Sequence, residues 1–257
     1  MGEAVPAEPT ALLRRVTIPV AAAVVLVVAA AWYATWTSAD FLMALMAPSI
    51  PTSTNLALFF ALLLAMMVAM MLPSAMPMIL AFRELTRLEG GRPTKRADNA
   101  ATALFLMPYF LVWGAFGVAA LLALSALGLL GSVMGPVLLA SAATLVVAGL
   151  WQLTRTKEVC LTSCTSPMSF IMRHWRSGSI GAMRMGFRHS LYCIGCCWLF
   201  MLVLFVSGAM SLVWMGAISL VIFAEKTGAR PVLFSRAIGV GLMLLGGLVS
   251  IQALGVF

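Results

Sequence analysis

Long runs of apolar residues, separated by short polar segments, dominate this sequence. A helix needs about 20 mostly apolar residues to cross the hydrocarbon core of a bilayer. Runs close to this length predict seven transmembrane helices, at residues 16–36, 55–82, 100–125, 135–153, 190–207, 209–224 and 237–257. Only Ser207 and Gly208 separate the fifth and sixth runs, which we interpret as a tight helical hairpin. The predicted fold class is all-α, a polytopic transmembrane helix bundle.

Composition agrees with this pattern, because 63% of the residues are hydrophobic and only 9% are charged. We expect residues 16–257 to form a single transmembrane helical domain and residues 1–15 to be a disordered cytoplasmic tail. Arg14 and Arg15 precede the first apolar run, as in a signal peptide. That run is longer than the usual h-region, so we interpret it as an uncleaved anchor.

The net charge of +8 has a topological explanation. All 16 Lys and Arg residues lie in the N-terminal tail or in three other stretches, namely 83–99, 154–189 and 226–236. The alternate connections carry none, so the positive-inside rule predicts a cytoplasmic N-terminus and an outer C-terminus. The expected partner of these charges is the lipid bilayer, and we exclude nucleic acid.

Three thiols and an imidazole stand at the head of the fifth apolar run. His189, Cys193, Cys196 and Cys197 fall within about 100° of one helix face, so one cation can meet all four. Buried Cys residues also serve as small hydrophobes, which leaves packing as the simpler interpretation. The predicted topology puts these thiols on the reducing side, where metal binding or transient redox chemistry is favoured over structural disulfides.

The preceding polar segment, 154–189, holds the other two cysteines. Cys160 and Cys164 are spaced i, i+4, and Ser166-Pro167 predicts the start of a short interfacial helix. Glycines at 178, 181 and 186 are expected to let the chain return to His189. We therefore expect Cys160 and Cys164 to lie against Cys193 and Cys196 and to complete one site.

The second apolar run is rich in methionine and contains Pro73 and Pro77, which are expected to kink it. Its thioethers are either core filling or a metal relay, for which the candidates are Met66, Met67, Met70 and Met71. Thioether and thiolate ligands together select Cu(I), whereas zinc is more usually held by Cys and His without Met. Copper (Cu+) is the predicted metal, with zinc as the alternative.

The sixth run ends at Glu225-Lys226, where a carboxylate opposes the helix macrodipole and should have a partner. Lys226, Arg184 and Arg188 are the candidates. One interpretation is a weak surface ion pair. The other is that Glu225 is an outer-shell partner of His189 or a proton acceptor.

Several of these motifs resemble one known family. They are Gly186–Trp198 with its Cys-x-Gly-Cys-Cys-Trp stretch, Gly208-Ala209-Met210, Trp214-Met215, Glu225-Lys226, Gln152–Lys157 with Cys160 and Cys164, and Met66–Pro77. Together they are similar to a bacterial family of predicted metal-binding integral membrane proteins, a domain of unknown function, over most of residues 55–230. Thr165 and Ser190 depart from the family pattern, where Arg and Gly are common. The resemblance implies metal binding, commonly suspected to involve copper, in the inner (plasma) membrane of a bacterium.

The leading hypothesis is a Cu(I)-binding membrane protein that transports, delivers or stores copper, with a metal chaperone or other membrane subunits as partners. A membrane thiol oxidoreductase using Cys193 and Cys196 is one alternative. A zinc-stapled subunit of a larger membrane complex is another. The sequence contains no P-loop, G-x-G-x-x-G or H-E-x-x-H motif, so an enzyme is the less favoured interpretation.

Overall fold

The computed structural model describes residues 9–38, 53–86, 99–127, 134–206 and 212–254. Within these ranges every regular element is an α-helix, as predicted. In chain order they are α1 (Pro9–Thr37), α3 (Ser53–Thr86), α4 (Asn99–Ala126), α5 (Met134–Gln152), α6 (Arg155–Thr165), α7 (Pro167–His174), α8 (Gly178–Val206), α9 (Leu212–Thr227) and α10 (Pro231–Ala253).

Four stretches of the described helices are long and apolar enough to cross a membrane: Phe60–Thr86, Asn99–Ala120, Gly178–Val206 and Pro231–Ala253. A bent pair, Leu138–Gln152 with Arg155–Thr165, is a candidate for a fifth. These helices are those of a membrane protein by length and composition. The total of seven spans and the cytoplasmic N-terminus stay predictions.

The N-terminal helix begins earlier than the sequence pattern suggested. α1 starts at Pro9, so residues 9–15, expected in a disordered tail, belong to a helix, while residues 1–8 lie outside the described part. Ala11, Leu12 and Leu13 are strong helix formers, and proline is well tolerated at a first helical position.

The bend between α5 and α6 sets the direction of α6, the helix that carries Cys160 and Cys164. The two helix axes differ by 69°. At the break, the Thr154 hydroxyl caps α6 by accepting a hydrogen bond from the backbone N–H of Lys157 at 3.2 Å. α6 therefore packs against α8 instead of continuing along α5.

The segment 154–189 differs from the expected single short helix. It contains α6 and α7, and α8 begins at Gly178, well before the predicted residue 190. Gly178 has φ +79°, a conformation that suits glycine at the turn into α8. Gly186, expected to loosen the chain, instead brings two helices together, because a Cβ there would lie 2.0 Å from the carbonyl oxygen of Phe105.

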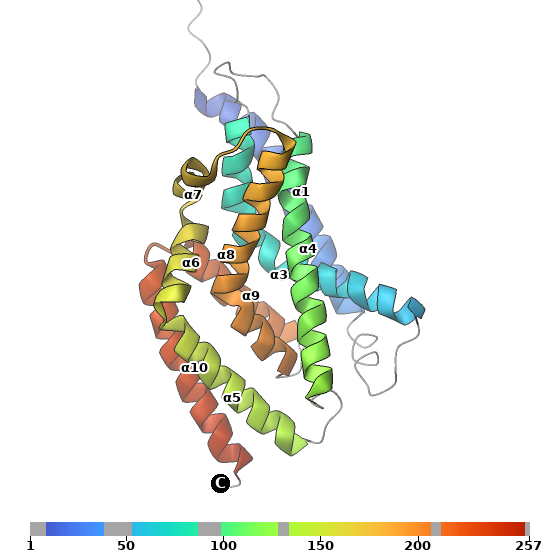
Figure 1. Cartoon of the computed structure of the whole chain (residues 1–257), viewed down its shortest axis with the longest axis vertical. Helices are drawn as coiled ribbons and strands as arrows, with labels where there is room; N and C mark the ends of the chain where they lie inside the picture. Colours follow the sequence, from blue (N-terminus) through green and yellow to red (C-terminus); the bar gives the residue numbers. More distant parts are fainter. Residues whose placement is uncertain (1–8, 39–52, 87–98, 128–133, 207–211, 255–257) are drawn as a thin grey trace, which may run out of the picture.

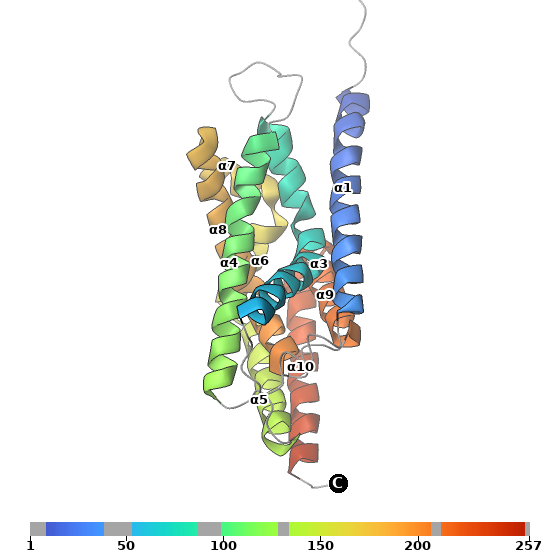
Figure 2. The same cartoon turned by 90° about the vertical axis from the view of Figure 1, so that its right-hand side faces the viewer.

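The helices pack in pairs: α4 along α8, α10 along α5, and α1 along α3. Figure 1 shows α5 and α10 side by side, and they run in opposite directions because Gly149 meets Gly239 while Gly246 meets Ala142. Figure 2 shows α1 beside α3. α3 contains Pro73 and Pro77 and is visibly bent in Figure 2. Gly186 meets Phe105 and Cys193 meets Tyr109, so α4 and α8 run in the same direction.

Candidate metal centre

The buried face of α8 carries the four residues of the predicted ligand motif. His189, Cys193, Cys196 and Cys197 are each at most 2% exposed. Their spacing of four, three and one residues places them on one side of the helix, where side chains of α3, α4 and α6 reach them. The thiols therefore point into the protein and not toward lipid.

Cys164 of α6 reaches this face from another part of the chain. Its Sγ lies 4.0 Å from the Sγ of Cys196, which also lies 3.1 Å from the carbonyl oxygen of Cys193. Cys160, one turn earlier, is half-buried against Gly195, where an added Cβ would lie 2.6 Å from its Sγ. The bend before α6 thus brings the two cysteine segments together.

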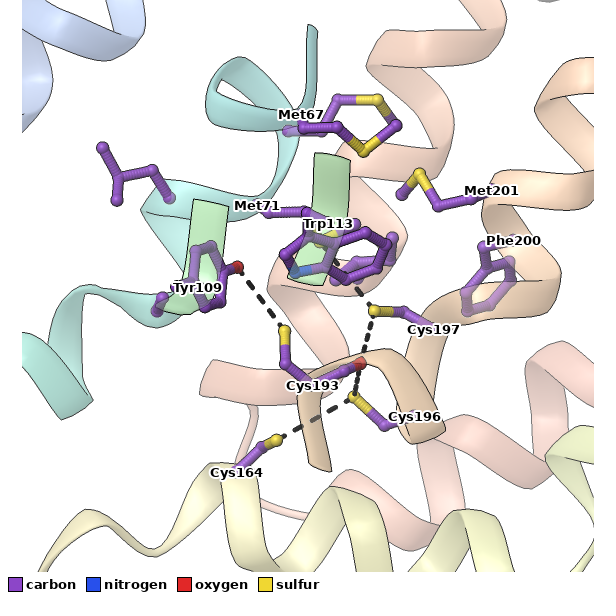
Figure 3. Packing of buried hydrophobic residues seen from close by; sticks show 14 of the residues in the cluster. Met67, Met71, Tyr109, Trp113, Cys164, Cys193, Cys196, Cys197, Phe200 and Met201 are labelled. Carbon is purple, nitrogen blue, oxygen red and sulfur yellow. Dashed lines mark hydrogen bonds between the residues drawn. The ribbon is translucent and has the colours of Figure 1, made fainter. Parts of the chain in front are cut away.

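A third segment contributes a thioether. The Met71 Sδ of α3 lies 3.9 Å from the Sγ of Cys197, which donates to the carbonyl oxygen of Cys193 at 2.8 Å. Figure 3 shows this line of sulfur atoms from Cys164 through Cys196 and Cys197 toward Met71. Met66, Met67 and Met70 are also buried in the core, within one turn or so of Met71 on α3.

The His189 ring is buried between aromatic rings. It is stacked with Phe105 and Tyr109 at centroid distances of 5.8 and 5.9 Å, and Phe170 meets it edge-on at 5.8 Å. Neither ring nitrogen has a hydrogen-bond partner among the residues that the structure describes. A buried imidazole without a partner is energetically costly, so its nitrogens are chemically available inside the protein.

A lysine enters the thiol cluster. The Nζ of Lys226 lies 3.1 Å from the Sγ of Cys193 and 3.3 Å from the hydroxyl of Ser74. The Tyr109 hydroxyl is 3.5 Å from the same Sγ. Cys193 is therefore the thiol in closest contact with a cation.

Glu225 lies next to this lysine in sequence but pairs elsewhere. Its Oε2 is 2.7 Å from the Nζ of Lys157, and its Oε1 accepts from Gln152 at 2.7 Å. Lys157 also donates to the carbonyl oxygen of Cys196. The surface ion pair envisaged for Glu225 is wrong, because both side chains are at most 2% exposed, and its partner is none of Lys226, Arg184 and Arg188.

Lys157, Lys226 and Tyr109 were not among the predicted site residues. The charge pattern placed both lysines in polar connections, whereas each is buried beside a cysteine of α8. The position of Lys226 directly after an apolar run was the available sign that it is buried.

In the part of the chain that the structure describes, no three Cys, His, Asp or Glu side chains form a ready-made metal group. The sulfur pairs are nevertheless at bridging distance. A metal–thiolate bond is about 2.3 Å long, as measured for zinc. Two sulfur atoms bound to the same ion are therefore at most about 4.6 Å apart. The Cys164–Cys196 and Met71–Cys197 distances of 4.0 and 3.9 Å lie within this limit.

Comparison with known proteins gives one family. The family model described as "PpoB2: Copper chaperone" matches residues 60–249. This range includes every candidate ligand discussed above. No curated protein and no solved structure matches the chain.

Proposed function

The chain belongs to the PpoB2 copper chaperone family, and from this premise we propose that it binds Cu(I) in the buried sulfur cluster and passes the ion to a partner. Membership of the family supports copper handling in general. The observation that carries the specific proposal is a pair of sulfur contacts on α8: Cys164 of α6 lies 4.0 Å from Cys196, and Met71 of α3 lies 3.9 Å from the adjacent Cys197. Soft sulfur ligands select Cu(I) over harder cations.

The proposed core ligands are His189, Cys193, Cys196 and Cys197, with Cys164 completing the site. Cys164 and Cys196 already lie at a distance that one ion can bridge. Cys160 is the more exposed member of its pair and is proposed as the first thiol that an arriving ion meets. On binding, the thiols of Cys196 and Cys197, which lie against the Cys193 carbonyl oxygen, would turn toward the ion.

Charge balance supports a monovalent ion. One Cu(I) bound by two thiolates, with the other thiols of the cluster protonated, carries a net charge of −1, which is costly in a low-dielectric interior. The ammonium group of Lys226, 3.1 Å from Cys193, neutralises that charge. The role of Glu225 is indirect. It holds Lys157 against the backbone of Cys196.

The buried methionines of α3 provide a proposed relay. Met66, Met67, Met70 and Met71 lie within a stretch of six residues of α3, and Met71 contacts Cys197. Thioethers bind Cu(I) without losing a proton, so they suit transient steps. We place this process in the inner membrane of a bacterium, with a soluble metal chaperone or another membrane subunit delivering or receiving the ion.

Anaerobic titration of the purified chain with Cu(I) against a chromogenic chelator tests the proposal. We expect stoichiometric binding by the wild type and a loss of at least tenfold in affinity for Cys196→Ser and Cys197→Ser. Met71→Leu should weaken binding, while Met78→Leu, a buried methionine farther along α3, is the matched control. A wild-type protein that binds no Cu(I) contradicts the proposal, and retention of zinc instead supports the zinc-stapled alternative.

One observation favours a membrane thiol oxidoreductase, although with Cys164 in place of Cys193 as the partner of Cys196. Cys164 and Cys196 lie 4.0 Å apart and are both free, so a small movement can join them. A variant with one cysteine replaced, such as Cys164→Ser, tests that activity. If it traps a mixed disulfide, and copper does not change the amount trapped, the oxidoreductase is supported instead.

A further inference from the structure

A groove of about 800 Å³ lies between α4 and the first half of α8, on the exposed side of α8. Its walls are largely apolar: Leu111, Val112 and Ala115 come from α4, and Ile180, Met183 and Phe187 come from α8. The thiol cluster occupies the opposite, buried side of α8. The groove is therefore separate from the proposed copper site.

The same groove carries a concentration of positive charge. Arg176, Arg184 and Arg188 line it, and its lining includes neither Asp nor Glu. All three side chains are exposed, and within the described ranges none of them forms an ion pair. An anionic group can bind here without displacing an existing partner.

The arginines of the groove lie toward one end, among apolar residues of α8, whereas the other end is lined by apolar residues of α4 alone. α4 and α8 run in the same direction and meet where Gly186 contacts Phe105. The arginines stand near that level or before it, whereas Ala115 lies ten residues beyond Phe105, about 15 Å farther along α4. A ligand that fills the groove has an anionic head and an apolar tail.

The position of the arginines in α8 identifies the source of such a ligand. α8 has 29 residues and is about 44 Å long, which exceeds the hydrocarbon thickness of about 30 Å. Its stretch from His189 to Val206 contains no Asp, Glu, Lys or Arg, so Arg184 and Arg188 fall at one edge of the apolar zone. Anionic headgroups at that depth attract Lys and Arg.

From these observations we infer that the groove binds an anionic phospholipid, with its phosphate at Arg184 and Arg188 and an acyl chain along Leu111 and Ala115. This inference does not depend on copper binding. It identifies a lipid site on α4 and α8, the helices that also hold Tyr109 and His189.

The full-length protein, purified in detergent, is incubated with phosphatidylglycerol or phosphatidylcholine and analysed by native mass spectrometry. We expect preferential retention of phosphatidylglycerol. The preference should fall about fivefold for each of Arg184→Gln and Arg188→Gln. Arg230→Gln is the matched control, because Arg230 is exposed and does not line the groove, and it should retain the wild-type preference.

Two further measurements make the result decisive. Ala115→Phe fills the apolar end while keeping every arginine, so it should reduce lipid retention without changing the charge. Circular dichroism and the thermal unfolding temperature confirm that each variant is folded. Equal retention of the two lipids, an equal loss in Arg230→Gln, or competition by inorganic phosphate with no effect of Ala115→Phe overturns the inference.

Discussion

The Nζ of Lys226 lies 3.1 Å from the Sγ of Cys193, inside the protein and next to three other cysteines. Among the described residues, no carboxylate lies within salt-bridge distance of this ammonium group, because the neighbouring Glu225 pairs with Lys157. A buried cation of this kind is stable only beside groups that can carry negative charge. The cluster therefore contains a positive charge that can balance a thiolate.

Replacing Lys226 tests whether this charge supports metal binding. Lys226→Met should lower the affinity for Cu(I) by about tenfold or more, since an uncompensated charge within a few ångströms costs several kcal/mol at an effective dielectric constant near 20. The measurement is anaerobic chelator competition. Ser74→Ala is the control, because it removes the other Lys226 contact and leaves the charge in place. Unchanged affinity in Lys226→Met contradicts the charge-balance role.

The buried Lys157–Glu225 pair should matter for stability. Glu225→Gln or Lys157→Met leaves one buried charge without its partner, which typically costs about 3–5 kcal/mol. Thermal unfolding in detergent should show a clear loss for each single variant. The double variant Lys157→Met with Glu225→Leu should recover much of it, because both charges are then gone.

The chain offers an exposed pair as the matched control. Arg236 and Glu158 are 3.2 Å apart, with side chains 56% and 42% exposed. Arg236→Gln should change the unfolding free energy by less than about 1 kcal/mol. Equal effects of Arg236→Gln and Glu225→Gln would contradict the burial of the Lys157–Glu225 pair.

Gly186 should be required for the contact between α4 and α8. In Gly186→Ala the new Cβ would meet the backbone of Phe105, which cannot move aside like the end of a side chain. We expect a lower unfolding temperature and weaker Cu(I) binding, because Tyr109 and His189 depend on the same contact. Gly216→Ala, with nothing within 4 Å of the added Cβ, is the control and should be neutral or stabilising.

The apolar pattern was sufficient to predict most helices. Each of the seven apolar runs lies largely within a helix of the described ranges, because apolar runs of this length have few other ways to satisfy their backbone in lipid. The boundaries were less accurate. Continuation of α8 back to Gly178 follows from its packing on α4, which the composition of residues 178–188 does not reveal.

The sulfur residues were predictable because their spacing on one helix is local. The approach of Cys164 to Cys196 was predicted from a hairpin that the glycines at 178, 181 and 186 would allow, and the contact is present at 4.0 Å. The bend between α5 and α6, which directs α6 against α8, was not predicted. Lys157, Lys226 and Tyr109 could not be found in the same way, because their approach to α8 depends on how four separate helices pack. Charge counting along the chain assigned both lysines to polar connections.

Replacing His189 distinguishes a role in metal binding from a role in packing. His189→Phe keeps an aromatic ring between Phe105 and Tyr109 and removes two buried nitrogens that have no hydrogen-bond partner in the described part of the chain. Because an unsatisfied buried polar group costs about 1–3 kcal/mol, the metal-free variant should be as stable as the wild type or more so. If the imidazole binds copper, the variant should nevertheless bind Cu(I) more weakly.

X-ray absorption spectroscopy at the copper edge identifies the atoms bound to copper and so tests whether His189 is a ligand. The wild type should show one nitrogen neighbour beside sulfur, and His189→Phe should show sulfur alone. His174→Phe is the control, because the Nδ1 of His174 already contacts the carbonyl oxygen of Phe170 at 2.9 Å. A sulfur-only wild-type spectrum, with equal Cu(I) affinity in His189→Phe, would assign His189 to packing and leave the thiols and Met71 as the whole ligand set.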